Sequence, residues 1–185
     1  MKLPIVRYGD PILRAKGKRV LVIDDRLREL AANMLETMHE AHGIGLAAQQ
    51  VGEALQLTVL DVSGAEDQVS TIKLNGVEAD SNLSMPLVLL NPELSLGKEN
   101  GLSVEGCLSF PEITADIQRA LSVTVHAQDL EGDPIQIEAT GLLARALQHE
   151  IDHLNGILFI DRMSAATKVA LRSRLKRLRR ENAPR

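Results

Sequence analysis

The sequence HEIDH at residues 149–153 constrains this chain more than any other segment. The surrounding residues predict a helix from about Gly141 to Asn155, with Thr140 as its N-terminal cap and a glycine just beyond its end. Two histidines four residues apart on a helix point their rings from the same face, about one turn from each other. His149 and His153 therefore form a pair on one side of the predicted helix.

The flanking residues indicate that this helix is mostly buried. Leu142, Leu143 and Leu147 precede the second histidine, and two unpartnered histidines inside a core would be costly. Two neutral imidazoles at this spacing can bind one divalent metal ion, while Glu150 accepts a proton from a metal-bound water. The alternative, a polar helix with two unrelated histidines, is the weaker interpretation.

A catalytic site of the zinc type usually has a third protein ligand, and the sequence offers two candidates. Asp161 lies eight residues after His153, although the chain does not match the HExxHxxGxxH pattern. Cys107 is the only cysteine, which excludes an internal disulfide, and a lone cysteine is most often a small buried hydrophobe. Its position beside Gly106 and the presence of the histidine pair favour a thiolate ligand, which suits iron(II), zinc, nickel or cobalt.

A glycine-rich segment, GIGLAAQQVG, covers residues 43–52. It does not match the dinucleotide-binding pattern GxGxxG, because Ala48 stands at the third glycine position and no strand precedes it. The segment is either a simple connector after a helix or a tight loop that places the amide of Gln50 in a cleft. In the second case Gln50 could donate a hydrogen bond to a developing oxyanion.

The remaining periodicity predicts an α+β fold. Helices are expected over residues 24–41 and 165–180, and strands near residues 55–59, 87–90, 121–125 and 135–137. Asn75-Gly76 predicts a two-residue hairpin turn, and residues 63–85 around it are polar enough to protrude from the main sheet. We expect small antiparallel or mixed sheets packed around the central HExxH helix, with an N-terminal helix and a basic C-terminal helix.

Length, composition and charge narrow the class of protein. A chain of 185 residues fits one domain, which we divide into a catalytic body, residues 1–161, and a basic helix and tail, residues 162–185. The tail has nine basic residues and one acidic residue, whereas the body has 12 basic and 24 acidic residues. Three aromatic residues are too few for a base-stacking surface. The chain shows neither a signal-peptide core nor a membrane span, so we expect an intracellular protein with no membrane contact.

Three segments in this order and spacing resemble the peptide deformylases. The matching positions are Gly43-x-Gly45-Leu46-Ala47-Ala48-x-Gln50, Glu105-Gly106-Cys107-Leu108-Ser109 and Gln148-His149-Glu150-x-Asp152-His153. The segment YGDPILR at residues 8–14 also resembles the opening of that family. The resemblance covers nearly the whole chain, and three motifs in register make it specific.

The resemblance implies an enzyme that removes the N-formyl group from nascent polypeptides begun with formyl-methionine. It assigns Glu150 as the general acid and base, and Gln50 with the backbone N–H of Leu108 as oxyanion donors. The metal ligands that it implies are Cys107, His149 and His153. The metal would be iron(II), with zinc, nickel or cobalt able to occupy the site.

The resemblance also implies a methionine pocket and an extended substrate that pairs with two backbone segments, residues 44–46 and 105–106. The expected substrate-binding residues are Gly43, Ile44, Gly45, Leu46, Val104, Glu105, Gly106 and Ala146. Two positions depart from the family. Arg145 stands where relatives often have an apolar residue, and Thr114 stands where some have an arginine. Both departures bear on substrate preference.

The basic C-terminal helix is either a solvated face or a surface for a polyanion. Because the substrate emerges on the ribosome, we expect this helix to contact ribosomal RNA, and we expect a bacterial, cytoplasmic protein. One alternative is an HExxH metallopeptidase or amidase, which would not need Cys107 as a ligand. Another is a non-catalytic ribosome-associated protein with the same fold, which would be expected to lose Glu150 or Gln50.

Overall fold

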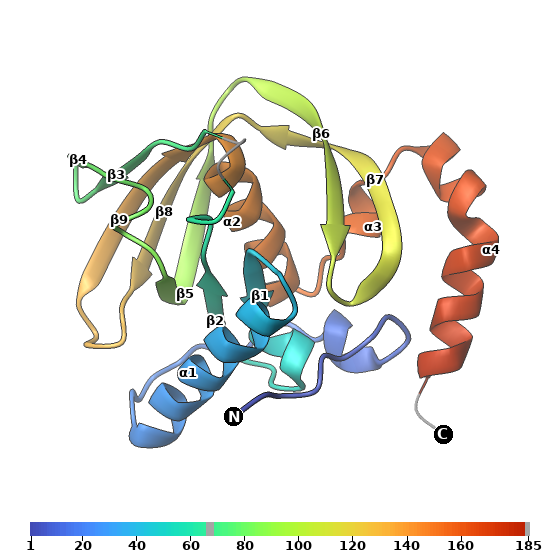
Figure 1. The fold of residues 1–185 in the computed structure, drawn as a ribbon, viewed down its shortest axis with the longest axis horizontal. Helices are drawn as coiled ribbons and strands as arrows, with labels where there is room; N and C mark the ends of the chain where they lie inside the picture. Colours follow the sequence, from blue (N-terminus) through green and yellow to red (C-terminus); the bar gives the residue numbers. More distant parts are fainter. Residues whose placement is uncertain (66–68, 184–185) are drawn as a thin grey trace.

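The computed structural model describes residues 1–65 and 69–183. One helix, α2 (Gly141–Leu154), lies at the centre of the molecule, with a large sheet on one side and a two-stranded hairpin on the other (Figure 1). Helix α1 (Asp25–Glu40) covers part of the sheet, and helix α4 (Ala165–Asn182) lies at the far edge beside the hairpin. The predicted α+β architecture around a central HExxH helix is confirmed.

The large sheet has seven strands in the order β1-β2-β5-β8-β9-β3-β4, and every adjacent pair is antiparallel. Its strands are β1 (Gly45–Ala47), β2 (Leu57–Leu60), β3 (Ile72–Leu74), β4 (Val77–Ala79), β5 (Leu87–Leu96), β8 (Ser122–Gln128) and β9 (Pro134–Thr140). The second sheet consists of β6 (Asn100–Cys107) and β7 (Phe110–Ala120). Short helices complete the chain: η1 (Pro11–Arg14), η2 (Ala48–Val51) and α3 (Phe159–Arg162).

Helix α2 is buried over almost its whole length. Its apolar side packs into one cluster with residues of β2, β5, β8 and β9. Thr140 occupies the predicted N-cap position, but its side chain does not cap the helix. Its hydroxyl pairs with that of Thr71 at 2.6 Å and makes no capping hydrogen bond. Instead the hydroxyl of Ser70 accepts a hydrogen bond from the backbone N–H of Leu143, at 3.0 Å.

Helix α1 follows its sequence signals closely. The side chain of Asp24 accepts a hydrogen bond from the Leu27 backbone N–H at 2.9 Å, which caps the helix. Ala31, Met34 and Met38 are fully buried and pack against the sheet, as their spacing of three to four residues predicts.

The hairpin at Asn75-Gly76 forms, but it does not protrude from the main sheet as predicted. Strand β3 pairs with β9, so the hairpin adds two strands to the edge of the large sheet. The segment also contains residues 66–68, which lie outside the described part of the chain. The β6–β7 hairpin, which the sequence analysis did not predict, lies on the side of the central helix opposite the large sheet.

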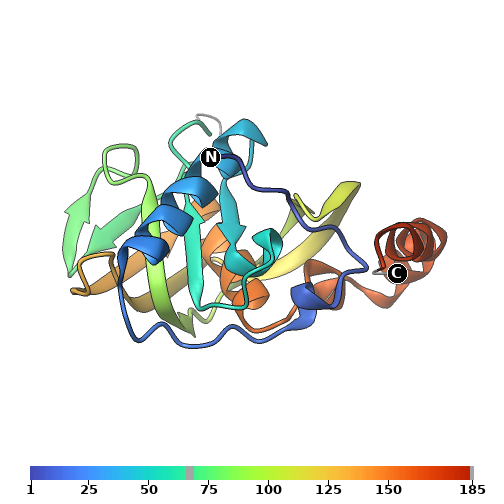
Figure 2. The ribbon, with the colours of Figure 1, turned by 90° about the horizontal axis from the view of Figure 1, so that it is seen from below.

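Helix α4 runs close to its predicted bounds and rests on the molecule through one stripe of leucines. Leu171, Leu175 and Leu178 pack against a cluster that includes Phe110 and Phe159. None of the helix's described residues is fully buried, and Figure 2 shows it at one edge of the molecule. Residues 184–185 of the predicted tail lie outside the described chain. Within residues 1–65 and 69–183, no helix combines the length and apolarity that crossing a membrane requires.

Candidate metal centre

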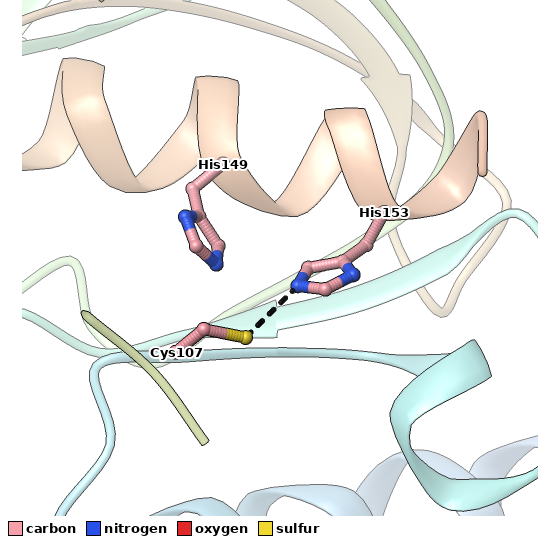
Figure 3. A group of neighbouring side chains, drawn as sticks. All are labelled: Cys107, His149 and His153. Carbon is pink, nitrogen blue, oxygen red and sulfur yellow. Dashed lines mark hydrogen bonds between the residues drawn. The ribbon is translucent and has the colours of Figure 1, made fainter. Parts of the chain in front are cut away.

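Two neighbouring elements bring Cys107, His149 and His153 together. Both histidine rings project from one face of α2 toward the cysteine at the end of β6 (Figure 3). A ligand atom of each residue lies within 4.8 Å of the other two, and Cys107 Sγ lies 3.3 Å from His153 Nε2. Both histidines are buried, so α2 presents the pair inside the molecule as the spacing predicts.

This donor set fits a divalent metal ion. In a tetrahedral site, metal–sulfur and metal–nitrogen bonds of about 2.3 and 2.0 Å leave roughly 3.5 Å between neighbouring ligand atoms. Thiolate and imidazole suit iron(II), zinc, nickel and cobalt better than magnesium or calcium. Nδ1 of His149 faces Glu105 Oε2 at 3.1 Å, which leaves Nε2 as the nitrogen available to a metal.

Glu150 is buried beside these ligands. Burial, aided by the charge of Glu105 and opposed by the charges of His149 and Arg119, raises the pKa of its carboxyl to about 7. Among the described residues, Oε2 of Glu150 has no hydrogen-bond partner. Gly45 packs directly on this carboxyl, because a Cβ at Gly45 would overlap it. The site therefore holds a buried carboxyl of raised pKa with one oxygen unpaired among the described residues.

Gln50 and the turn after Cys107 face the same place. Oε1 of Gln50 accepts a hydrogen bond from the Ala47 backbone at 2.9 Å, which fixes the direction of its amide group. Its Nε2 then points toward Ser109 Oγ at 3.2 Å and Cys107 Sγ at 3.6 Å. The glycine-rich segment is thus the tight-loop alternative, a short strand followed by a 3-10 turn that places an amide donor beside the sulfur of Cys107.

A cleft of about 560 Å³ opens onto this site between β1 and β6. Seven of the eight predicted substrate-binding residues line it: Gly43, Ile44, Gly45, Val104, Glu105, Gly106 and Ala146. The predicted catalytic residues Gln50, Leu108 and Glu150 line it as well, and so do Arg145 and Thr114. Leu46 is different, because its side chain is fully buried against α1.

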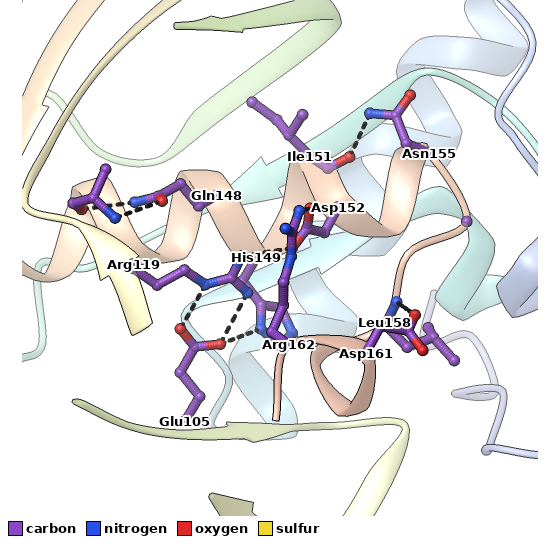
Figure 4. A network of polar contacts seen from close by, with 12 residues as sticks. Glu105, Arg119, Gln148, His149, Ile151, Asp152, Asn155, Leu158, Asp161 and Arg162 are labelled. Carbon is purple, nitrogen blue, oxygen red and sulfur yellow. Dashed lines mark hydrogen bonds and ion pairs between the residues drawn. The ribbon is translucent and has the colours of Figure 1, made fainter. Parts of the chain in front are cut away.

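A layer of buried charges holds the metal ligands from behind (Figure 4). Arg119, on β7, donates to both oxygens of Glu105 at 2.8 and 3.1 Å. Burial would raise the pKa of Glu105, but hydrogen bonds from His149 and Arg119 and the Arg119 charge outweigh it and lower the pKa to about 2. Glu105 is therefore an anion that fixes His149, a role that sequence analysis did not assign to it.

The same layer of charges extends to Asp152 and Arg162. Arg119 also donates to Asp152 at 2.5 Å, and Arg162 donates to that carboxylate at 2.6 and 3.1 Å. Sequence analysis quoted Asp152 in the motif and missed both arginines. A buried carboxylate on an apolar helix signals a cationic partner, but nothing local identifies which arginine supplies it.

Asp161, the alternative third ligand, lies elsewhere. Its carboxylate pairs with Arg14 and accepts a hydrogen bond from the Leu158 backbone at 2.9 Å. It takes no part in the ligand group that the described residues form. Cys107 is thus the residue that completes the cluster.

Comparisons with known proteins agree with this geometry. The family model of polypeptide deformylase matches residues 2–169. A peptide deformylase of Opitutus terrae is 47% identical over 180 residues, covering 96% of this chain and 93% of the relative. One of Methylacidiphilum infernorum is 48% identical over 183 residues, covering 99% and 96%.

Solved structures give the same result. The crystal structure of peptide deformylase 1B of Arabidopsis thaliana with an inhibitor has a TM-score of 0.83 and 37% identity, covering 98% of this chain and 91% of that one. The peptide deformylase of Thermotoga maritima has a TM-score of 0.76 and 37% identity, covering 89% and 99%.

Proposed function

The chain belongs to the peptide deformylase family, whose members remove the formyl group from N-formylmethionine, and we propose how its own residues carry out this reaction. The Cys-His-His site is typical of the family. Cys107, His149 and His153 hold the metal, and the single observation that supports this most directly is their convergence within 4.8 Å. Glu150 is the general acid and base.

The proposed chemistry follows from the groups around the cleft. When bound, the metal lowers the pKa of a water molecule and polarises the formyl carbonyl. Glu150, poised near neutral pH, accepts a proton as the water attacks the formyl carbon. The amide of Gln50 and the backbone N–H of Leu108 donate hydrogen bonds to the developing oxyanion. Glu150 then returns the proton to the leaving amine.

The assay is deformylation of formyl-Met-Ala-Ser by anaerobically purified, iron-loaded protein. We expect Glu150→Gln to lose at least 10²-fold in kcat, because proton transfer contributes about 10²–10⁴-fold. Glu131→Gln, which changes an exposed carboxylate, is the matched control and should retain full activity. An inactive wild type, or an active Glu150→Gln protein, would refute the mechanism.

We propose iron(II) as the physiological metal, with nickel, cobalt or zinc able to replace it. A thiolate with two imidazoles suits all four ions. Metal analysis of protein purified under anaerobic conditions tests this. Iron at about one equivalent is the expected result, and a full equivalent of zinc with no iron would contradict it.

The substrate is proposed to bind as an extra strand. Strand β1 is at one edge of the large sheet and β6 is at the edge of the hairpin, and both line the cleft. An extended peptide can pair with such free edges. The side chains of Ile44 and Val104, which are 38% and 67% exposed, would form with Ala146 and the side of His149 the walls of a methionine pocket.

The preferred first residue can be measured directly. We expect formyl-Met peptides to exceed formyl-Gly peptides in kcat/KM by at least 10-fold, because a filled apolar pocket contributes about 1.5–3 kcal/mol. Ala146→Phe should narrow this difference by filling the pocket. An unchanged preference in that variant would place the methionine side chain elsewhere.

We also propose that α4 contacts the ribosome and that the protein works in the bacterial cytoplasm. Helix α4 is exposed and strongly basic, whereas the catalytic body, residues 1–161, is acidic. Ribosomal RNA is a polyanion, so it would attract the helix and not the body. The relatives from Opitutus terrae and Methylacidiphilum infernorum are bacterial, which supports the location.

Removing α4 would expose the leucine stripe, so charge substitutions are the sharper test. One variant replaces three exposed basic residues of α4 by glutamine: Arg172, Lys176 and Arg180. The control replaces three exposed basic residues of the body: Lys16, Arg26 and Lys98. Ribosome co-sedimentation at low salt should fall strongly in the first variant only. Equal binding by both variants would refute the contact.

A further inference from the structure

The N-terminal segment Val6–Tyr8 contacts both of the loops that supply the proposed oxyanion donors. The backbone N–H of Val6 donates to the carbonyl of Gln50 at 2.8 Å, and that of Tyr8 donates to the carbonyl of Ser109 at 2.9 Å. The ring of Tyr8 also stacks on Phe110, with ring centroids 4.6 Å apart. This segment therefore joins two loops that lie more than fifty residues apart in the sequence.

Arg7 lies between these two contacts and lines the cleft. Its guanidinium Nη1 donates a hydrogen bond to the backbone carbonyl of Leu108. Leu108 is the residue whose own N–H is the second proposed oxyanion donor. Within the described residues the Arg7 side chain has no other hydrogen-bond or ion-pair partner, so the Leu108 carbonyl is the one polar group that it binds there.

We infer that Arg7 is a positioning residue for the reaction, and that Val6–Tyr8 braces the two oxyanion donors against each other. The inference rests on the proposed roles of Gln50 and Leu108. Leu108 follows the ligand Cys107 at an irregular turn, where the strand register shifts between Gly106 and Cys107. Cys107 pairs with Phe110 across the turn, but the register shift separates this pair from the rest of the ladder, so the Arg7 contact adds a constraint on the direction of the Leu108 peptide groups.

The magnitude follows from what a small displacement costs. Removing an oxyanion donor outright lowers turnover by about 10²–10³-fold, and a displacement near 1 Å can cost up to about 10²-fold. Losing Arg7 leaves the N–H of Leu108 in place but less constrained. We therefore expect Arg7→Ala to lower kcat by roughly 10- to 100-fold, with little change in KM.

The experiment compares Arg7→Ala and Arg7→Lys with the wild type on formyl-Met-Ala-Ser, at equal metal content. Arg7→Lys retains a cationic donor and should keep most of the activity, and added guanidinium should partly restore Arg7→Ala. Hydrogen exchange of the backbone in residues 105–112 should be faster in Arg7→Ala. Arg26→Ala, which removes an exposed arginine far from the cleft, controls for the loss of charge.

The outcomes separate this inference from the proposed function. Gln50→Ala is measured alongside, and full activity of that variant refutes the oxyanion assignment itself. If Gln50→Ala is impaired while Arg7→Ala keeps its kcat, the brace is refuted and the mechanism stands. A rise in KM at constant kcat in Arg7→Ala would also overturn the inference, because it would make Arg7 a substrate contact.

Discussion

Arg119→Met tests whether the buried charges behind the metal site stabilise the fold. The guanidinium of Arg119 is 4% exposed and donates to Glu105 and Asp152 on two different elements. Methionine fills similar volume without a charge. The substitution leaves Glu105 with His149 alone and Asp152 with Arg162 alone, so both buried carboxylates lose their shared partner.

The structure gives two routes to the magnitude. Breaking a buried ion pair by removing one partner costs about 3–5 kcal/mol. Independently, the pKa of Glu105 falls from 4.5 to about 2, which corresponds to roughly 3 kcal/mol of net stabilisation of its charged form. His149 supplies part of that stabilisation, so we expect a loss of about 3 kcal/mol in the free energy of unfolding. For a chain of this length the expected decrease in Tm is roughly 10 °C.

The measurement is urea and thermal unfolding of the metal-free proteins in chelator, because bound metal would add its own stabilisation. Arg162→Ala is the matched control. Its side chain is 46% exposed and Asp152 keeps Arg119, so we expect it to cost about 1 kcal/mol or less. A loss below about 1 kcal/mol in Arg119→Met, or equal losses in both variants, would refute the reasoning.

Three further predictions use other parts of the site. A Cβ on Gly45 would overlap Glu150, so Gly45→Ala should lower kcat by roughly 10-fold or more with normal metal content. Cys107→Ala should purify with little metal, whereas a peptidase with Asp161 as ligand would retain it. Burial would raise the pKa of Asp161, but the hydrogen bonds from Arg14 and the Leu158 backbone, together with the charges of Arg14 and Lys168, outweigh it and lower that pKa. Asp161 therefore stabilises the fold above the ordinary carboxyl pKa, and this contribution is lost as pH falls through the lowered value. Asp161→Asn should cost less than about 1 kcal/mol at pH 7, and the difference from wild type should vanish in acid unfolding series.

The elements that sequence predicted well are those whose signals are local. The caps and spacing of α1 lie within sixteen residues, and the histidine pair of α2 lies within one turn. Asn75-Gly76 likewise specifies its own hairpin turn, but it does not specify which strand the hairpin pairs with. The pairing of β3 with β9 joins residues more than sixty positions apart, and no local pattern encodes it.

The β6–β7 hairpin shows a different reason for failure. Strand β6 alternates between exposed and less exposed positions, but its polarity is inverted: Val104 is apolar and exposed in the cleft, whereas Glu105 is charged and buried. Strand β7 alternates in the usual way, with Ile113, Ala115 and Ile117 buried at every second position. That period of two could have predicted strand β7 from the sequence. A functional strand obscures the pattern because its exposed side faces substrate instead of solvent.

In the candidate site, too, the residues with local sequence signals were predicted and those with distant partners were not. Residue types and spacing identified the two histidines and Glu150, because one helix presents them all. The residue pattern alone left Cys107 and Asp161 as candidates, and the family resemblance selected Cys107. The fold places Cys107 beside the histidines and Asp161 beside Arg14. The supporting arginines were not predictable, since each reaches its carbonyl or carboxylate partner across the chain.

These distant contacts serve two separable purposes. Arg119 joins β7 to β6 and α2 through buried charges, so its loss should reduce stability and metal retention together. Arg7 is only half-buried and binds a single carbonyl, so its loss should reduce turnover and leave the free energy of unfolding nearly unchanged. Measuring stability, metal content and kcat in both variants distinguishes a site held by its core from one held by its N-terminal segment. If Arg7→Ala lost stability in the same proportion as Arg119→Met, the two arginines would belong to one structural unit and the brace would have no distinct role.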